Sequence, residues 1–397
     1  MSVTSPKGFR AAGTAAGLKT NGAKDLALVV NDGPADLAVA AGVFTANRFA
    51  AAPVHLSRRH LALAQSGLAV PRAVVLNSGG ANACTGQQGV SDAALTAQRV
   101  AELLQIAPHD VLVCSTGLIG DSLAMDKLLP GLEEVAATAQ ATPKVGQDAA
   151  EAIMTTDTVP KQAQLEAPDG AYSIGGMAKG AGMLAPELAT MLVVITTDAV
   201  LDQATARQAL EQACAQSFNR IDSDGCMSTN DSVILLVSGA SGHRPEPSQF
   251  AQLLTAVAQD LARQLIADAE GASHEIAVTV KGALTEDGAL AVARGIVRSN
   301  LFKTAMAGND PNWGRILSAA GTVPAAVAPF DPAKVDVTIG GAMVCQGGGP
   351  GVAREQADLT GRVVEVLVDL HAGTCQATIW TNDLTHEYVS INADYSS

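Results

Sequence analysis

Residues 179–198 read Lys179-Gly-Ala-Gly-Met-Leu-Ala-Pro-Glu-Leu-Ala-Thr-Met-Leu-Val-Val-Ile-Thr-Thr-Asp198. This stretch places Thr190 where a segment rich in glycine, alanine and proline meets an apolar run. Met191 to Ile195 are all apolar, which is typical of a buried strand. Pro186 fixes its own φ, and the glycines before it permit backbone angles that other residues avoid. The pattern fits an ordinary loop-to-strand junction, and it also fits a nucleophile held at the start of a rigid strand.

The second interpretation makes a specific chemical demand. A threonine hydroxyl is a weak nucleophile that needs an adjacent base. An N-terminal threonine carries one in its own α-amino group, whose reference pKa is about 7.7–8.0. That amine exists only after the chain is cut between Ala189 and Thr190, so the uncut precursor would be inactive. On composition alone the ordinary junction is the commoner case, and residues elsewhere must decide.

The whole segment resembles the self-processing signature of the ornithine acetyltransferase family, also called bifunctional glutamate N-acetyltransferase/amino-acid acetyltransferase. Further blocks resemble the same family in the same order along nearly the full chain. They are residues 43–54 (VFTANRFAAAPV), 77–86 (NSGGANACTG), 114–120 (CSTGLIG), 153–158 (IMTTDT), 268–271 (DAEG), 308–315 (GNDPNWGR) and 391–395 (INADY). Several ordered blocks are a much more specific signal than any one of them.

The resemblance implies an α+β fold, a layered αββα-type sandwich with a self-processed N-terminal threonine nucleophile. It implies an alpha chain of residues 1–189 and a beta chain of residues 190–397. An apolar strand follows the cut at once, so we do not expect the cut to be a structural domain boundary. The two chains are expected to stay associated, as a heterotetramer of two alpha and two beta chains.

The implied activity is transfer of an acetyl group from N-acetylornithine to glutamate through an acetyl-Thr190 intermediate, in the acetyl-recycling step of arginine biosynthesis. No metal or organic cofactor is expected. Acetyl-CoA use as a second donor stays open, because no motif in the chain reports it.

Site residues follow from the matching positions. Thr116 and Gly117 match the pair that forms the family's oxyanion hole, which an attack on an amide carbonyl requires. The positions that match substrate contacts are Thr156, Lys179, Thr190, Glu270, Asn392 and Ser397. Lys179 suits the α-carboxylate that both substrates share. For Glu270 the sequence leaves three roles open: favouring the cationic donor, orienting Lys179 or backbone donors, or standing as a surface carboxylate at a helix end.

Two other functions stay open on the sequence. An N-terminal-nucleophile aminopeptidase or amidase would use the same nucleophile with water as acceptor. A non-catalytic amino-acid-binding protein would bind without turnover. The chain also departs from the family pattern at Gly80, at Glu187 near the scissile bond, and at Cys226-Met227; none of these removes the nucleophile, the oxyanion pair or Lys179.

Composition excludes several classes of function. The net charge is −14 and aromatic residues make up 3% of the 397-residue chain, which argues against binding to nucleic acid or anionic membranes. The N-terminus has no apolar leader. The cysteines lack Cys-x-x-Cys spacing and the histidines lack paired metal spacing. We therefore expect a cytoplasmic protein without a zinc site. Asp222, Asp224 and Asp231 share one polar stretch, and structural hydrogen bonding is the expected role for them.

Apolar runs predict buried strands, and one helical period and one longer helix are expected. The strand-like runs are Leu26–Val30, Ala73–Leu76, Val111–Cys114, Met191–Ile195, Val233–Val237, Ile276–Val280, Val335–Ile339, Val363–Val368 and Ala377–Trp380. The helices are expected around residues 93–104 and over Ser248–Ala267. Ala136–Pro143 and Gly239–Pro247 are the expected loops, and Lys179 is expected on a loop flexed by glycines.

Overall fold

The computed structural model describes residues 2–185 and 191–394. The chain divides into two compact units: a first unit of residues 1–219 and 226–265, and a second unit of residues 220–225 and 266–396. The main boundary, between residues 265 and 266, falls near the end of a long helix. The short segment 220–225 belongs to the second unit although the residues on either side of it belong to the first. The described part of the first unit has two sheets and that of the second unit has one, and each unit has its own apolar core.

The first sheet of the first unit has four strands in the order β1-β2-β4-β5. Every residue of strands β2, β4 and β5 is buried, which explains the apolar run with which each of them begins. β4 and β5 run parallel, with Ser78 opposite Thr116 at their carboxyl ends. The strands are β1 (Phe9–Thr14), β2 (Leu26–Asn31), β4 (Ala73–Ser78) and β5 (Val111–Thr116).

The second sheet of this unit has five strands in the order β3-β9-β8-β7-β6. β8 and β9 run parallel at its centre, and β7 lies antiparallel to β8. Both central strands are fully buried. The strands are β3 (Val39–Phe44), β6 (Lys161–Glu166), β7 (Ser173–Lys179), β8 (Leu192–Thr197) and β9 (Ser232–Val237).

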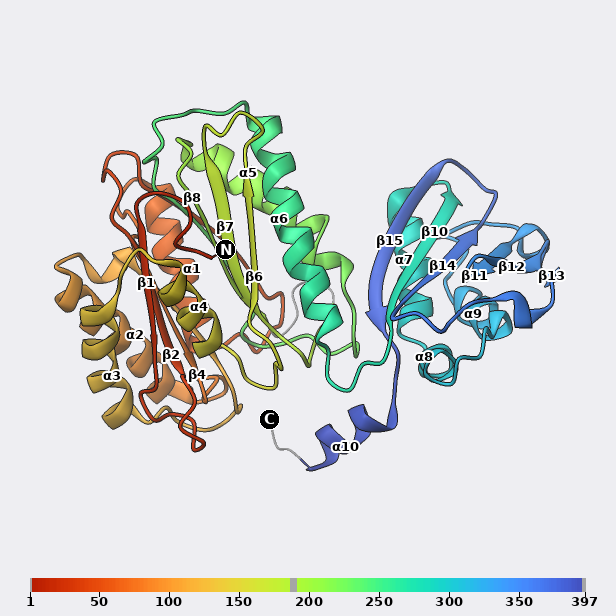
Figure 1. The fold of residues 1–397 in the computed structure, drawn as a ribbon, viewed down its shortest axis with the longest axis horizontal. Coiled ribbons are helices and arrows are strands. Elements are labelled where there is room, and N and C mark those ends of the chain that lie inside the picture. The colour runs from red at the N-terminus through yellow and green to blue at the C-terminus, as the bar shows by residue number, and fades with distance from the viewer. Residues whose placement is uncertain (1, 186–190, 395–397) are drawn as a thin grey trace. The chain divides into compact units, whose positions relative to one another are not determined.

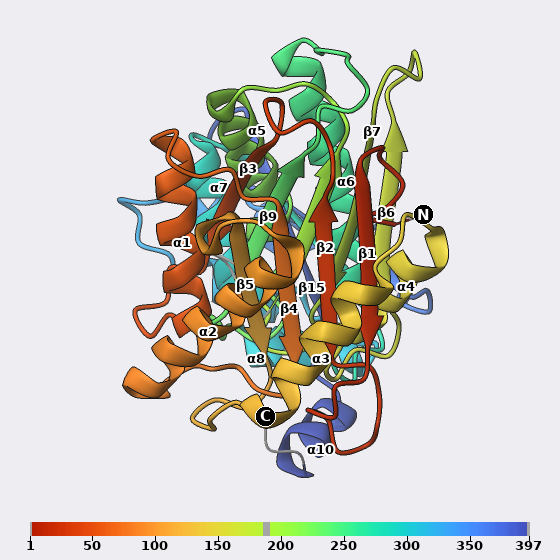
Figure 2. The same ribbon diagram turned by 90° about the vertical axis from the view of Figure 1, so that its left-hand side faces the viewer.

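The two sheets pack face to face through a shared core to which Leu76 and Leu112 contribute from one sheet and Val194 and Ile234 from the other. Helices cover the outer face of each sheet, so this unit is an αββα sandwich, and the predicted α+β fold is confirmed for it (Figures 1 and 2). The helices are α1 (Ala52–Gln65), α2 (Gly86–Leu104), α3 (Met125–Thr138), α4 (Pro143–Ala152), α5 (Gln203–Ala215) and α6 (Pro247–Ala267).

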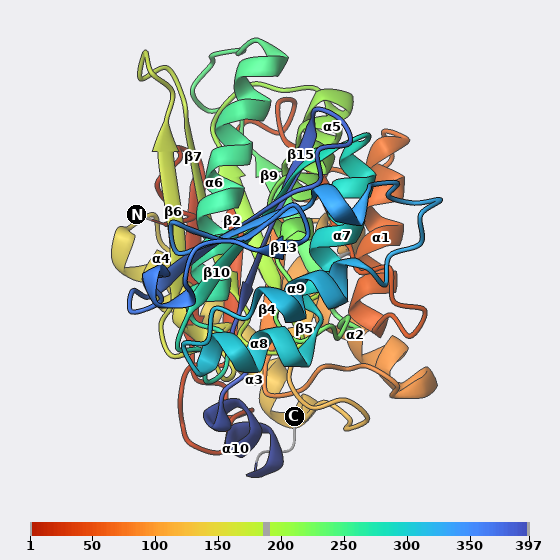
Figure 3. The same cartoon turned by 90° about the vertical axis from the view of Figure 1, so that its right-hand side faces the viewer.

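The second unit holds a six-stranded sheet in the order β13-β12-β11-β14-β10-β15. Helices α7, α8 and α9 pack against it through one apolar core (Figure 3). The strands are β10 (Glu275–Ala283), β11 (Asp336–Ile339), β12 (Ala342–Gln346), β13 (Gly349–Pro350), β14 (Val363–Asp369) and β15 (Cys375–Asn382). The helices are α7 (Glu286–Val297), α8 (Asn300–Ala307), α9 (Trp313–Ala320) and α10 (His386–Asp394).

Short 3-10 turns complete the elements: η1 (Pro108–Asp110), η2 (Phe218–Arg220), η3 (Pro332–Lys334) and η4 (Arg354–Gln356). Among the described residues, no helix combines the length and the apolar character that crossing a bilayer requires.

Each apolar run that predicted a strand is found in a strand, although β8 and β11 begin one residue after Met191 and Val335, and both predicted helices are found as α2 and α6. The loop expected over Gly239–Pro247 is confirmed up to Pro247, which begins α6. The loop expected over Ala136–Pro143 is wrong at both ends, because α3 continues to Thr138 and Pro143 begins α4, where a proline is favourable. The resemblance implied two central sheets, and the third sheet of the second unit adds to them.

The predicted cut between Ala189 and Thr190 lies outside the described residues. The strands on either side of it, β7 and β8, are neighbours in one sheet of the first unit. Residues 1–189 therefore contribute β3, β7 and β6 to that sheet, and residues 190–397 contribute β9 and β8 between them.

Candidate active site

Lys179 is the last residue of β7 and its side chain is 1% exposed. The expectation that it stands on a flexible loop is therefore wrong: the glycines follow a strand that fixes it. Its Nζ donates a 2.7 Å hydrogen bond to Thr155 Oγ1 and a 3.4 Å hydrogen bond to Thr116 Oγ1. Two residues predicted from separate blocks, Lys179 and Thr116, are thus brought together across the two sheets.

Asp157 holds this ammonium group in place. Its Oδ2 lies 3.9 Å from Lys179 Nζ and its Oδ1 accepts a 2.6 Å hydrogen bond from Lys161 Nζ. The backbone N–H groups of Gly180 and Thr155 also donate to the carboxylate, at 2.7 and 2.9 Å. All three charged side chains are buried. Two ammonium groups facing one carboxylate give the cluster a net positive charge, which suits an anionic ligand.

The charges in this cluster are strongly coupled. Burial alone would raise the pKa of the Asp157 carboxyl, but the ammonium groups of Lys179 and Lys161 outweigh it and lower that pKa to about 2. The carboxylate is therefore ionised at any physiological pH. Predicted from sequence as a substrate contact, Thr156 lies between Thr155 and Asp157, half-buried beside this cluster.

Strand β5 ends at Thr116, and the next residue, Gly117, has a backbone conformation that favours glycine. Gly117 has φ +134°, and a Cβ at this position would lie 2.4 Å from the Gly80 nitrogen. The N–H groups of Gly79 and Gly80 both donate 3.0 Å hydrogen bonds to the Thr116 carbonyl. This close approach of two turns fixes the backbone at the predicted oxyanion pair.

A buried amide network supports the same turn. Asn230 Nδ2 donates to the carbonyls of Ala81 and Ser115 at 2.6 and 2.8 Å. Ser115 Oγ donates a 2.6 Å hydrogen bond to Asn77 Oδ1. Asn230 lies just before β9 of the second sheet, so the network ties the end of that sheet to the end of the first. These hydrogen bonds from buried side chains hold the backbone at the predicted oxyanion pair in a fixed position.

Met191 begins the second described range, and its backbone is also fixed. Its N–H donates a 3.1 Å hydrogen bond to Asp231 Oδ1, and its carbonyl accepts from the Ser232 N–H at 3.1 Å. The start of β8 is therefore tied to the start of β9. Thr190, Ala189, Glu187 and Ser397 lie outside the described residues.

Glu270 and Asn392 lie in the second unit and are joined directly. Asn392 Nδ2 donates a 2.9 Å hydrogen bond to Glu270 Oε2 and a 3.0 Å hydrogen bond to the Tyr388 carbonyl. Glu270 follows α6 and Asn392 lies on α10, so residues more than a hundred positions apart meet here. The sequence did not predict this contact of Glu270 with Asn392.

The family model for the ArgJ family matches residues 10–397. The chain is also 54% identical over 399 residues to the arginine biosynthesis bifunctional protein ArgJ of Bifidobacterium longum, with 100% of each chain covered. The chain belongs to the ArgJ family. The protein of the same name from Streptomyces avermitilis is 56% identical over 397 residues, again with full coverage of both.

Solved structures of ArgJ relatives match as well. A Mycobacterium tuberculosis ornithine acetyltransferase complexed with ornithine is 50% identical, covers 48% of this chain and 96% of its own, and has a TM-score of 0.44. The arginine biosynthesis bifunctional protein argJ of Bacillus halodurans is 38% identical, covers 48% and 95%, and has a TM-score of 0.42.

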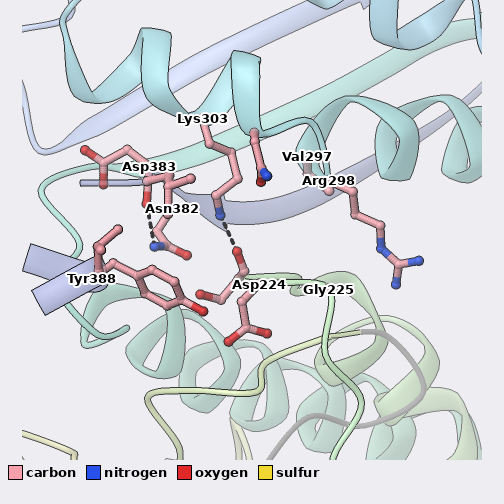
Figure 4. A pocket seen from close by; sticks show the side chains of 12 residues that line it. Asp224, Gly225, Val297, Arg298, Lys303, Asn382, Asp383 and Tyr388 are labelled. Carbon is pink, nitrogen blue, oxygen red and sulfur yellow. Dashed lines mark hydrogen bonds between the residues drawn. The ribbon is translucent and has the colours of Figure 1, made fainter. Parts of the chain in front are cut away.

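This ArgJ-family chain has a separate pocket in its second unit, of about 370 Å³, which none of the predicted site residues lines (Figure 4). Lys303 points into it and donates to the Ser223 carbonyl. Burial lowers the pKa of Lys303 to about 8, and Asp222, Asp224 and Asp383 only partly oppose this. In the part of the chain that is described, no three or more metal-ligating side chains lie close enough together to hold a metal ion.

The three aspartates grouped in the sequence separate in the structure. Asp222 accepts a 2.7 Å hydrogen bond from Arg298 Nε and a 3.0 Å hydrogen bond from the Gly225 N–H. Asp224 lines the pocket of the second unit, and Asp231 lies in the first unit. The prediction of hydrogen-bonding roles is confirmed for Asp222 and Asp231.

Sequence reasoning missed Asp157 and Lys161 in this ArgJ-family site. Asp157 stands inside a block that was recognised, one residue after the predicted Thr156. The sequence shows Asp157 as a single carboxylate flanked by two threonines. Its two lysine partners can be identified only once β6 and β7 are known to pair.

Proposed function

We propose that this chain is an acetyltransferase of arginine biosynthesis that moves an acetyl group from N-acetylornithine to glutamate through an acetyl-Thr190 intermediate. The full-length relatives carry the name of an arginine biosynthesis bifunctional protein. A solved relative at 50% identity is an ornithine acetyltransferase complexed with ornithine. The observation that carries the proposal is the meeting of the Lys179 ammonium with the Thr116 hydroxyl, with Lys179 paired in the sheet to Leu192, the first residue of β8.

In this proposal the chain first cuts itself between Ala189 and Thr190. The new α-amino group of Thr190 then serves as its general base. Attack on the acetyl carbonyl creates an oxyanion, which the Thr116 hydroxyl and the Gly117 N–H stabilise. Ornithine leaves, glutamate enters and takes the acetyl group from the Thr190 ester. The two half-reactions predict ping-pong kinetics.

Substrate recognition uses the positive cluster. Lys179, held by Asp157, is assigned to the α-carboxylate that both substrates carry, and Thr156 lies beside it. The proposal also assigns Glu270, Asn392 and Ser397 to substrate binding. Glu270 orients the Asn392 amide through their 2.9 Å hydrogen bond. No resident metal or organic cofactor is part of the proposed reaction.

Association and location complete the proposal. The alpha and beta chains stay together because their strands alternate in one sheet, and two of each form a heterotetramer, which light scattering of the purified protein would check. The proposed location is the cytoplasm. Acetyl-CoA as a second donor is tested by supplying it with glutamate in place of N-acetylornithine.

One assay separates the three functions that the sequence left open. Purified protein is incubated with N-acetylornithine and glutamate, and the products are separated. We expect ornithine and N-acetylglutamate in equal amounts. Free acetate in their place would indicate an amidase, and binding without products would indicate a non-catalytic protein.

Replacing Lys179 with methionine should weaken kcat/KM for both substrates about ten- to a hundredfold. A hydrogen bond to a charged group contributes about 1.5–3 kcal/mol, and about 1.4 kcal/mol corresponds to a factor of ten. Lys161→Met is the matched control, because Lys161 is equally buried and pairs with the same Asp157 carboxylate. Both proteins are assayed after complete cleavage has been confirmed by mass. Equal kinetics in the two variants would contradict the assignment of the carboxylate to Lys179.

Replacing Thr116 with alanine should lower kcat by about 10²-fold or more, because one oxyanion donor is lost. KM should change less, since the donor acts mainly on the transition state. Thr155→Ala is the control: it removes the other hydroxyl that the same ammonium group contacts, at 2.7 Å. A Thr116→Ala enzyme with normal turnover would remove this hydroxyl from the mechanism.

A further inference from the structure

The loop of residues 15–25 joins β1 to β2 at the edge of the first sheet where the predicted oxyanion pair lies. Strands β4 and β5 end together at this edge, with Ser78 opposite Thr116, and the antiparallel strand β2 begins there. The Ser78 N–H donates a 2.8 Å hydrogen bond to the Asp25 carbonyl. The last residue of the loop is thereby tied to the end of β4.

The buried Asp25 carboxylate gives this loop a fixed shape. It accepts hydrogen bonds from three N–H groups of the loop, among them those of Leu18 and Lys19 at 2.6 and 2.9 Å. Leu18 packs against the turn that follows β4, because a Cβ at Gly79 would lie 3.2 Å from its carbonyl carbon. The Gly79 N–H in turn donates to the Thr116 carbonyl. The loop therefore brings Lys19 beside the turn that holds the oxyanion pair.

Lys19 is half-buried, and its ammonium group is close enough to the Lys179 cluster for their charges to interact. Burial lowers the pKa of Lys19 below its ordinary value, and Asp25 opposes this. The Lys179 ammonium lowers the pKa further, and the Asp157 carboxylate raises it. Lys19 Nζ donates a 2.8 Å hydrogen bond to the Lys24 carbonyl. A lysine ammonium has three N–H donors, and this carbonyl is the one acceptor that the described residues offer it, so two donors are left for a ligand.

We infer that Lys19 binds the side-chain carboxylate of the acceptor glutamate. The inference rests on the proposed function, in which Lys179 holds the α-carboxylate next to the reacting amine. Lys179 is 1% exposed and contacts Thr116, so it belongs to the reacting end of the substrate. Lys19 is less deeply buried at the same edge, so it suits the other end. Glutamate has a second carboxylate there and N-acetylornithine has an ammonium group, so Lys19 attracts the acceptor and not the donor.

The test measures kcat/KM for each substrate in Lys19→Met, from initial rates of acetyl transfer. A ping-pong exchange gives the two values separately, one for each half-reaction. The value for glutamate should fall about ten- to a hundredfold, as for the loss of a hydrogen bond to a charged group. The value for N-acetylornithine should stay the same or rise. Lys179→Met differs, because it is expected to lower both.

Two further variants separate substrate binding from support of the loop. Lys127→Met is the matched control, because Lys127 Nζ donates a 3.0 Å hydrogen bond to the Gly17 carbonyl of the same loop. It should leave both values near those of the wild type. Lys19→Arg keeps the positive charge, so its kcat/KM for glutamate should exceed that of Lys19→Met. A lysine that only stabilised the loop would affect both substrates together.

An equal fall in both values in Lys19→Met, an unchanged value for glutamate, the same selective fall in Lys127→Met, or no recovery in Lys19→Arg would each overturn the inference. Each of these results would leave the transferase proposal standing, because the wild type still transfers acetyl groups. A wild-type protein that transfers no acetyl group would overturn the transferase proposal and this inference with it.

Discussion

Replacing Thr190 with alanine is expected to leave a single uncut chain and to abolish acetyl transfer. The substitution removes the hydroxyl that attacks the Ala189 carbonyl and the one that carries the acetyl group, so neither reaction has a nucleophile. Intact mass should show only the full chain in the variant, and two fragments, residues 1–189 and 190–397, in the wild type. Transfer is measured as ornithine released from N-acetylornithine in the presence of glutamate.

Thr190→Ser is the control for this experiment, because it keeps a hydroxyl and an α-amino group at the same position. It should retain some cleavage and some transfer. An uncut wild-type protein would contradict the processing prediction, and a Thr190→Ala protein that still transfers acetyl groups would place the nucleophile elsewhere.

Replacing Asp157 with asparagine should destabilise the protein by about 3–5 kcal/mol, because it removes one partner from a buried ion pair and leaves the ammonium groups of Lys161 and Lys179 uncompensated. The free energy of unfolding is measured by urea titration of uncut protein, with Thr190→Ala as the background for every variant. Asp32→Asn is the control, since its pair with Arg10 is solvent-exposed and should contribute at most about 1 kcal/mol.

The pH dependence of this effect has a defined sign. The pKa of Asp157 is lowered to about 2 in the folded protein, below the ordinary value of 3.8. A lowered carboxyl pKa contributes stability that is present above the unfolded pKa and lost as pH falls through the folded one. The difference in unfolding free energy between wild type and Asp157→Asn should therefore be constant at neutral pH and shrink below about pH 4. Equal stability at pH 7 would contradict the coupling of these charges.

Strands buried on both faces were predictable because their residues form unbroken apolar runs, as in β2, β5 and β9. β7 was missed because its sequence, SIGGMAK, contains two glycines and ends in lysine. Neighbouring atoms leave little room for a side chain at either glycine. A Cβ at Gly175 would lie 2.2 Å from the Ser2 carbonyl oxygen, which is far too close. Only the packed structure reveals that constraint, and with it the fixed position of Lys179.

Site residues could be predicted where one short sequence motif contains them. Contacts between residues from different motifs could not be predicted. Thr116 and Gly117 were identified from residues 114–120. The contact of Thr116 with Lys179 spans 63 positions and depends on how the two sheets pack. The four predicted strands of the second unit gave no sign of their order, because β10 pairs in parallel with β14 across intervening helices and turns. Alternating apolar residues define a face of a strand but not its neighbour.

The alternation of strands in the order β3-β9-β8-β7-β6 has a consequence for the history of the molecule. A cut between Ala189 and Thr190 would leave the sheet intact, with the β3–β9 and β7–β8 ladders joining one fragment to the other. The uncut precursor can fold into this strand order within one molecule, because all five strands belong to one continuous chain. The fragments, once unfolded and diluted, would have to meet and interleave from solution, a concentration-dependent search that competes with aggregation. Maturation would thereby convert a reversible fold into one assembled only once, so the lifetime of the mature protein would be set by how slowly it unfolds.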